Sequence, residues 1–485
     1  MNFIKQKNKN EINTDTYPAF GLFRTVWDDY GIKCEFILTY YSNKNEGKEI
    51  GRTKIIFKEN PSNHLFPEFD GTDSLYISLG QELSFYKNLV DFAGTEKSIE
   101  VLEQLNDIAW QSQKIEPFES DSKFRNALLR DNSARDTLRF GKQVILNEPF
   151  NKSFSFKYTT KAEDAEQPFT INVDFDETDP LPHRIVGIIG RNAVGKTHLM
   201  GSLARDLVQV RKVSQKSINQ KEESFSGDRP IFNRVITISY SAFDRFVIPT
   251  NPQNSYVYCG IRNSKGALSR SSLVQDYRDN IIRIQDLNRE ELWVTCMSHI
   301  LENHNDDFAN KLRLEVYAQH DSEEDTLSLL SSGQSILAHF VTALVARIQE
   351  NTLVLFDEPE THLHPNAVAH LFNVLNRVLI EHQSFAIIAT HSPIVIQEIP
   401  KKRVILLSRD GNNTSVIPMH FETFGESISE LTRHVFDTVS IPHYYKKVLK
   451  RLAQNMSFEE VDELFEYDLG LNARSYLLSQ YGTEQ

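Results

Sequence analysis

The chain has 485 residues, of which 40% are hydrophobic, so it exceeds one ordinary domain and can build a sizeable core. Its formal net charge of −13 argues against an all-over basic coat of the kind that wraps nucleic acid, but not against a local basic patch. The three cysteines, Cys34, Cys259 and Cys296, are too far apart for a disulfide framework or a paired-cysteine metal site.

The N-terminal part shows no targeting signal. Residues 1–16 are polar, without the apolar core of a signal peptide, and we expect them to be disordered. No apolar run reaches about 18 residues, so we expect a cytoplasmic protein without a membrane segment. Helical spacing over about 62–147 predicts a helical insertion inside a β-subdomain. The strands of that subdomain are expected at 20–27, 34–41, 53–57, 154–158 and 169–175.

A phosphate-binding pattern follows. The apolar run 184–189 predicts a buried strand that leads into G-x-x-x-x-G-K-T, and helical spacing continues from Leu199. The glycines let successive N–H groups face one anion, and the helix N-terminus adds its partial positive charge. Lys196 is expected to reach the β- and γ-phosphates, and the Thr197 hydroxyl is a hard oxygen ligand for Mg²⁺. The predicted nucleotide-binding residues are Gly190, Arg191, Asn192, Ala193, Val194, Gly195, Lys196, Thr197 and His198.

The next stretch carries less information. Residues 211–230 are charged and rich in Ser and Gln, which fits either a contact to nucleic acid or a solvated linker. A strand is predicted at 234–239, and a mostly helical lobe at about 245–326. The stretch Leu330–Gln334 then opens a predicted helix over 336–344, with Ser331 or Ser332 as its N-cap.

Two later strands end in polar residues. The apolar run 353–356 is followed by Asp357 and Glu358, and carboxylates are seldom placed at the end of a core strand without a partner. We expect Asp357 to hold the Mg²⁺ shell and Glu358 to orient or deprotonate the attacking water. The run 385–390 ends at His391, whose imidazole can hydrogen-bond the γ-phosphate or the water. A lone terminal histidine is usually structural, but its position after Glu358 favours a catalytic role.

Together these motifs resemble the head of ABC-type ATPases, over roughly 19–58 and 150–420. The segments Asp357–Pro365 and Thr390–Pro393 look like the soluble SMC/OLD/RecF-like branch rather than transporter subunits. The resemblance implies an α/β fold with a P-loop core, a mainly parallel sheet, an antiparallel β-subdomain, helical insertions and a small helical C-terminal extension. It also implies ATP and Mg²⁺ as ligands, and a homodimer or higher oligomer formed around ATP. In such a dimer the signature of one subunit completes the site of the other, here through Ser331, Ser332, Gly333 and Gln334.

Finer similarities point to anti-phage defence. The segments 256–262 and 420–427 resemble the ATPases of Septu-type and retron-associated systems, which act with an HNH-type nuclease encoded nearby. The resemblance implies an ATPase domain at 17–420 and a helical extension at 421–485. Fewer than about 100 residues follow His391, which is short for an appended nuclease domain. We therefore expect an ATPase that regulates, or senses for, a nuclease or other effector.

Alternatives stay open at this point. A DNA-repair or DNA-clamp ATPase of the RecF/SMC kind carries the same motifs, and so does a transporter energising subunit. The transporter is disfavoured by His364 at the position of an Asp, by the missing Gln after Ser239, and by Ser332 in place of a Gly. The basic run 446–451 fits contact with DNA, RNA or an acidic partner, or a plain solvated face.

Overall fold

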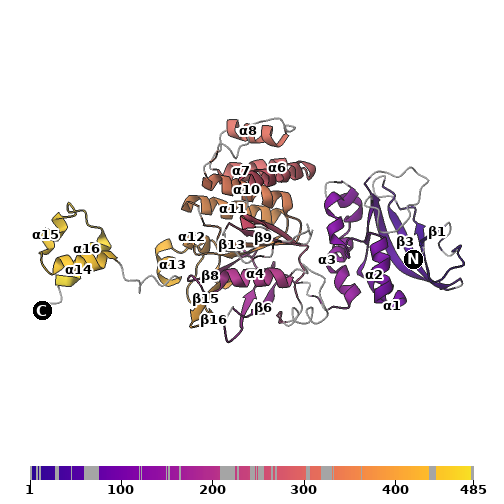
Figure 1. Ribbon diagram of the computed structural model, residues 1–485, viewed down its shortest axis with the longest axis horizontal. Coiled ribbons are helices and arrows are strands. Elements are labelled where there is room, and N and C mark those ends of the chain that lie inside the picture. The colour runs from indigo at the N-terminus through magenta and orange to yellow at the C-terminus, as the bar shows by residue number, and fades with distance from the viewer. Residues whose placement is uncertain are drawn as a thin grey trace. The chain divides into compact units, whose positions relative to one another are not determined.

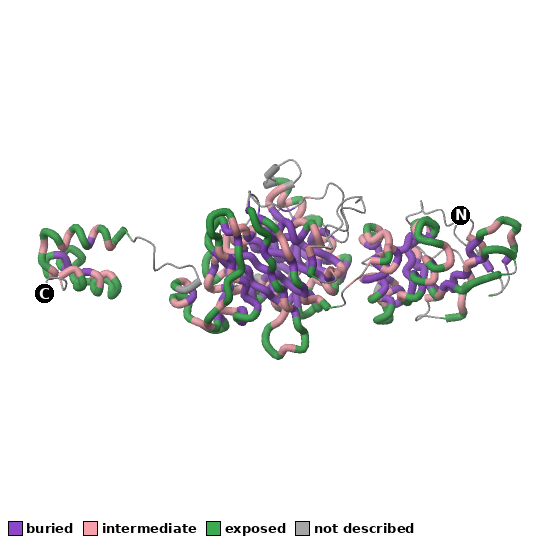
Figure 2. Tube along the Cα trace, turned by 90° about the horizontal axis from the view of Figure 1, so that it is seen from below, coloured by how far each residue is buried: buried purple, intermediate pink, exposed green. Residues whose placement is uncertain are grey.

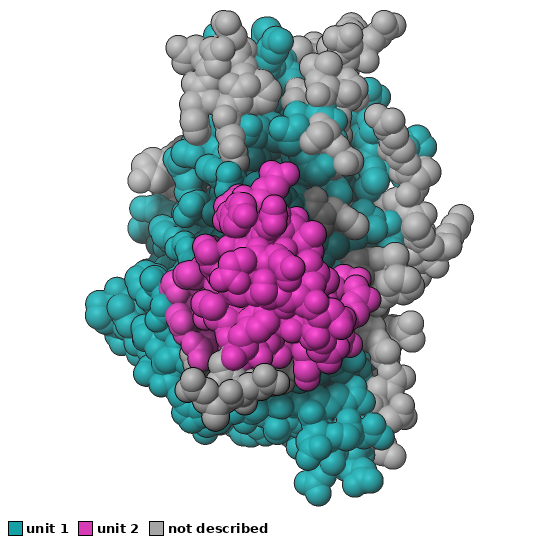
Figure 3. Space-filling view, turned by 90° about the vertical axis from the view of Figure 1, so that its left-hand side faces the viewer, with its two compact units in different colours: residues 1–426 teal, residues 427–485 magenta. Residues whose placement is uncertain are grey.

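The computed structural model divides the chain into two compact units, Met1–Glu426 and Ser427–Gln485 (Figure 3). Within residues 3–481, it describes all but 7–8, 10–11, 28–31, 45, 59–75, 119–120, 122, 149, 151–152, 163–164, 208–223, 227–228, 241–245, 247, 249–255, 264–265, 268–269, 302–305, 318–329, 331, 362 and 436–443.

The first unit is built on a seven-stranded sheet in which all neighbours run parallel except the last pair, β15 and β16. Every position of β8, β9, β13 and β14 is buried, because helices cover both faces of a parallel sheet. In spatial order its strands are β10 (Tyr256–Gly260), β9 (Arg234–Ser239), β13 (Thr352–Asp357), β14 (Phe385–Ala389), β8 (Ile185–Gly190), β15 (Val404–Asp410) and β16 (Asn413–Ile417).

Successive residues of β13 point to opposite faces of the sheet and pack against different helices. Leu353 and Leu355 of β13 belong to the core formed with α4 (Lys196–Leu207). Phe356, on the opposite face, stacks on Phe340 of α10 (Ser332–Arg347) at 4.8 Å between ring centroids. Figure 1 shows α4 on one side of the sheet, and α10 with α11 (Pro365–Glu381) on the other. Burial is concentrated in this central layer (Figure 2).

The helical lobe is joined to α10. Trp293 Nε1 donates to Thr342 Oγ1 of α10 at 2.8 Å, and Arg289 Nη1 donates to the carbonyls of Val345 and Ile348 at the end of that helix. The described part of the expected lobe begins with strands, because β10 pairs with β9 before any helix starts. Its elements after β10 are β11 (Arg262–Asn263), β12 (Gly266–Ala267), α6 (Arg270–Asp286), α7 (Glu290–Ile300) and α8 (Asp306–Tyr317).

The N-terminal part forms its own sheet and core, which corrects two expectations. Disorder over 1–16 is wrong for Phe3–Gln6, because this segment pairs in parallel with the strand that starts at Ala19 and Phe3 packs on Phe20. The segment 62–147 is not wholly helical either, since Tyr76–Gly80 is the fifth strand. The sheet comprises β1 (Phe3–Gln6), β2 (Ala19–Arg24), β3 (Glu35–Asn43), β4 (Glu46–Phe57) and β5 (Tyr76–Gly80), covered by α1 (Leu83–Ala93), α2 (Thr95–Gln104) and α3 (Asn132–Leu146). Three short helical turns, Ser112–Lys114, Glu116–Phe118 and Phe124–Leu128, link α2 to α3.

The two strands that were expected to close this sheet lie elsewhere. Instead, β6 (Phe156–Thr160) and β7 (Phe169–Val173) pair with each other, and their apolar residues join the core around α4. The β-subdomain is therefore divided between a separate N-terminal sheet and a hairpin on the P-loop core.

The second unit is helical, as expected. Its elements are α13 (Ile428–Val435), α14 (Tyr444–Ala453), α15 (Phe458–Glu463) and α16 (Leu471–Tyr481). The last three pack around Leu449, Val461 and Leu477. Across the described part of the chain, no helix has the length and apolar character that crossing a bilayer requires.

Candidate functional site

The phosphate-binding loop connects the end of β8 at Gly190 to the start of α4 at Lys196. Gly190 has φ +153°, and a Cβ there would lie 2.5 Å from the carbonyl oxygen of Leu407 on β15. A side chain at this position would therefore push the loop away from the neighbouring strand. Residues Arg191–Ala193 form an exposed tip, and the half-buried Thr197 follows in the first turn of α4.

The β15–β16 hairpin holds the loop from outside. Arg409 Nη1 donates to the carbonyl of Ala193 at 2.7 Å, and Thr414 Oγ1 donates to the carbonyl of Val194 at 2.9 Å. Ala193 has φ +65°, a conformation that a non-glycine residue keeps only when its surroundings fix it. Nothing in the sequence pattern indicated this role, because both residues lie more than 200 positions after the loop.

Lys196 lies at the centre of the site and is 5% exposed. Its ammonium donates to the carbonyl of Gly190 at 3.2 Å and lies 2.5 Å from Nε2 of His391. Burial lowers the pKa of Lys196, whereas the nearby carboxylates of Glu358, Asp357 and Glu360 raise it. The Lys196 ammonium thus lies near the acidic residues at the end of β13 and just after it.

Strand register brings these segments together. Asp357 of β13 is level with Ala389 of β14, and Ala389 is level with Ile188 of β8. The N–H of Glu358 donates to the carbonyl of Ala389 at 2.8 Å, and the N–H of Thr390 donates to that of Ile188 at 3.0 Å. Because parallel strands end at the same edge of a sheet, their next residues meet beside the loop.

Glu358 is held in an unusual backbone conformation, with φ +49°. This left-handed region is uncommon for a residue with a Cβ and is often found at functional sites. Its Oε1 lies 3.6 Å from Nε2 of His391, and both side chains keep about a third or less of their surface exposed, 34% and 26%. The two predicted catalytic side chains are therefore neighbours that solvent still reaches.

Glu360 was quoted within the acidic motif but given no role. Its carboxylate accepts hydrogen bonds from the hydroxyl of Thr390 at 2.9 Å and from the backbone N–H of His391. Burial raises the pKa of Glu360, and these two hydrogen bonds oppose the rise. Glu360 thus fixes the start of the His391 segment, and the only signal for it was a second acid two residues after Glu358.

The surroundings of His391 favour its neutral form. Burial makes the largest contribution to lowering the pKa of His391, the charge of Lys196 lowers it further, and the charge of Glu358 raises it. Since the Lys196 ammonium can only donate, Nε2 of His391 accepts, and the imidazole proton is assigned to Nδ1.

The residues at the strand end fit a magnesium ion. Asp357 is 2% exposed, and α4, which carries Thr197, packs on β13. No group of three or more acidic, His or Cys side chains that could hold a metal occurs among the described residues. Mg²⁺ does not require such a group, because it takes one or two protein oxygens and completes its shell with water and substrate phosphates.

Other predicted residues lie elsewhere or remain undescribed. His198 Nε2 is 3.1 Å from the carbonyl of Lys161, so it contacts the segment after β6. Ser331 lies outside the described residues, and so does the side chain of Ser332. Gly333 and Gln334 are in the first turn of α10, as expected, and α10 packs on α6, α7 and β10.

Comparisons of the sequence find a matching family and a curated relative. Residues 297–397 match the model of a family described as "AAA domain, putative AbiEii toxin, Type IV TA system". A curated relative, Protein ea59 of Escherichia phage lambda, is 26% identical over 489 residues, covering 93% of this chain and 92% of the relative.

Similar solved structures are ATPase heads and cassettes. The SMC head domain from Thermotoga maritima gives a TM-score of 0.29 at 12% identity, over 55% of this chain and 98% of that one. A nucleotide-free ATP-binding cassette from an ABC transporter gives 0.31 at 15% identity, over 60% and 100%. From its own loop and strand ends, the chain has a P-loop core built on a mainly parallel sheet.

Proposed function

We propose that the chain hydrolyses ATP at the edge of the central sheet. The observation that carries this proposal is the convergence of three strand ends, which sets Lys196 and Glu358 each beside the imidazole of His391. Lys196 and the loop N–H groups bind the β- and γ-phosphates, and Asp357 with Thr197 holds Mg²⁺. The ion neutralises charge on the phosphates when it is bound.

Glu358 is the proposed general base for the attacking water. Its carboxylate is partly exposed, so water reaches it, and the neutral imidazole of His391 lies beside it. A neutral histidine with its proton on Nδ1 presents Nε2 as an acceptor to Lys196 or to the water. Glu360 and Thr390 fix the backbone from which this imidazole projects.

We further propose that two copies pair around ATP. The first turn of α10 carries Gly333 and Gln334, and a helix of this length presents its N-terminal N–H groups to an anion. With Ser331 and Ser332, these residues would complete the site of the other copy.

The biological role proposed here is control of a nuclease or other effector in anti-phage defence. The matched family description names a toxin and a toxin–antitoxin system, and the curated relative is encoded by a phage. The partner itself is to be sought among the products of adjacent genes, by co-purification with this chain. A co-purifying HNH-type nuclease would support the role, whereas stable association with DNA alone would favour a repair or clamp ATPase.

Hydrolysis is tested by three variants. Glu358→Gln should bind ATP normally but release phosphate roughly 10²–10⁴-fold more slowly, because an amide cannot accept the proton from water. Lys196→Ala should lose nucleotide binding, and Glu381→Gln, an exposed residue at the end of α11, should behave as wild type. Near wild-type turnover of Glu358→Gln would assign the base elsewhere.

The shared site is tested by mixing two inactive variants. Ser331→Arg blocks the signature and Lys196→Ala blocks the loop, so a mixed dimer keeps one composite site with both groups intact. Random exchange of independent sites should restore up to about a quarter of wild-type hydrolysis. If mixing restores nothing and Glu358→Gln stays monomeric with ATP on a sizing column, the two copies do not share a site.

A further inference from the structure

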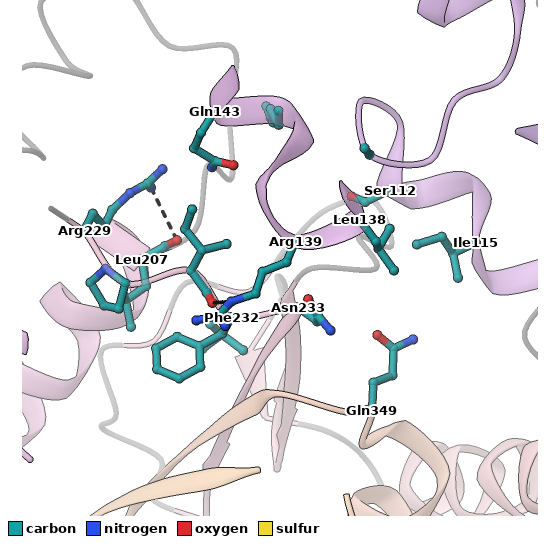
Figure 4. A pocket seen from close by; sticks show the side chains of 15 residues that line it. Ser112, Ile115, Leu138, Arg139, Gln143, Leu207, Arg229, Phe232, Asn233 and Gln349 are labelled. Carbon is teal, nitrogen blue, oxygen red and sulfur yellow. Dashed lines mark hydrogen bonds between the residues drawn. The ribbon is translucent and has the colours of Figure 1, made fainter. Parts of the chain in front are cut away.

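A cavity of about 120 Å³ lies between α3 and the P-loop core (Figure 4). One wall is formed by Arg139, Lys142 and Gln143 of α3. The opposite wall is formed by Leu207, which ends α4, and by the segment 229–235 that leads into β9. An apolar cavity of roughly 150 Å³ holds benzene, so this space suits a ligand of a few heavy atoms.

The walls are basic. Three cationic side chains line the cavity, Arg139, Lys142 and Arg229, and no carboxylate does. Arg229 has a carboxylate close by, since its Nη2 lies 3.8 Å from Oε2 of Glu148. Asp136 and Glu177, which do not line the cavity, raise the pKa of Arg139 through their charge. For Lys142, no hydrogen bond or ion pair is found among the described residues; its ammonium lies 5.6 Å from the centre of the Trp110 ring, and the charge of Glu148 raises its pKa.

The two arginines are fixed in place by backbone groups. Arg139 Nε donates to the carbonyl of Ile231 at 2.6 Å, and its guanidinium lies 3.8 Å from the centre of the Phe154 ring. Arg229 Nη1 donates to the carbonyl of Asp206 at 3.3 Å, at the end of α4. Burial lowers the pKa of Arg139 to about 10 and also lowers that of Lys142, so both groups gain from a nearby negative charge.

Unpaired acceptors accompany these cations. Gln143 is 7% exposed and its amide points into the cavity, yet its Oε1 has no hydrogen-bond partner (Figure 4). The Oδ1 atom of Asn233, on the opposite wall, is also buried without a partner. Leaving a buried acceptor unsatisfied is unfavourable, so a ligand that donates a hydrogen bond here is favoured.

We propose that this cavity binds a phosphate group that carries a hydroxyl donor. The lining cations face the anionic oxygens, and the hydroxyl donates to one of the two unpaired amide oxygens, that of Gln143 or that of Asn233. Monohydrogen phosphate has this combination of charge and donor, and so does a small phosphate monoester with a free hydroxyl. The site is separate from the phosphate-binding loop and does not depend on ATP hydrolysis.

The test measures phosphate binding by calorimetry in the Lys196→Ala variant, at constant ionic strength, so that the loop does not contribute. Binding should persist in this variant and should weaken by at least about tenfold when Lys142→Met is added, since a charge-assisted hydrogen bond is lost. Lys97→Met, which removes an exposed lysine on α2, is the matched control and should change nothing. Sulfate, which has the charge but no hydroxyl, should bind more weakly than phosphate.

A comparison of two ligands and a second cavity variant complete the test. Tighter binding of glycerol 3-phosphate than of inorganic phosphate would identify a monoester as the ligand, and the reverse order would identify free phosphate. If Lys142→Met lowers the unfolding temperature without ligand, Gln143→Leu, which keeps the side-chain volume, replaces it. The proposal is overturned if phosphate does not bind in Lys196→Ala, if sulfate binds equally well, or if the cavity variant matches the Lys97→Met control.

Discussion

The ammonium of Lys196 lies 2.5 Å from Nε2 of His391, although the two residues are 195 positions apart in the chain. This pair joins the phosphate-binding loop to the end of β14. The contact requires a neutral imidazole, since a protonated one would place two cations against each other. The charge state of His391 therefore depends on Lys196.

The pKa of His391 should respond in opposite directions to two substitutions. Removing the cation in Lys196→Ala should raise it, because the lysine charge now disfavours protonation. Removing the anion in Glu358→Gln should lower it further, because Glu358 favours protonation. NMR titration of the imidazole measures both shifts, with His391→Gln used to assign the signal. Shifts of the same sign in both variants would contradict the geometry.

Thr414→Val should weaken nucleotide binding by several-fold without unfolding the protein. The substitution keeps the side-chain shape but removes the hydrogen bond to the carbonyl of Val194, worth about 1 kcal/mol. Fluorescent-nucleotide titration measures the affinity, and Thr170→Val on the exposed face of β7 is the matched control. Equal affinities for the two variants would show that the hairpin does not hold the loop.

Asp107 should make the stability of the first unit depend on pH. Its buried carboxylate accepts hydrogen bonds from the Tyr86 hydroxyl and three backbone N–H groups, yet burial raises its pKa from 3.8 to about 7. A raised native pKa stabilises the fold fully below the unfolded value, and this contribution is lost as the pH rises through about 7.

The measurement is the difference in unfolding free energy between wild type and Asp107→Asn from pH 4 to 8. That difference should move against wild type as the pH rises, by at most roughly 1.4 kcal/mol per unit. Asp91→Asn, at an exposed position of α1, should show no such trend. A pH-independent difference for Asp107→Asn would show that the native carboxyl titrates near its ordinary value.

The exposed cations of α14 should be dispensable for hydrolysis. Leu449 of this helix packs into the core of the second unit, while Lys447, Lys450 and Arg451 are exposed. Lys447→Glu combined with Lys450→Glu should therefore keep the ATPase rate and the unfolding temperature. Any DNA or RNA binding by this helix should fall steeply with salt and weaken in the double variant. Altered hydrolysis would instead connect α14 to the site.

The sequence was sufficient for the parts of the site that are local. The phosphate-binding loop, the apolar runs before Asp357 and His391, and the helix after Leu330 each depend on residues close together in the chain. The spacing of apolar residues and the placement of glycines identify a strand, a turn or a helix without knowledge of the rest of the chain. The mainly parallel sheet was expected from the resemblance to ABC-type ATPases, and the near-continuous apolar strands agree with it, since helices cover both faces of a parallel sheet.

Tertiary structure alone decided which distant groups meet. Strand order and register set Glu358 beside His391, gave Glu360 its role in holding the His391 segment, and brought Arg409 and Thr414 to the loop. The N-terminal strand Phe3–Gln6 and the basic cavity beside α3 were likewise visible only in the tertiary structure. Each depends on contacts between segments far apart in the chain, and local propensity and periodicity contain no information about such partners.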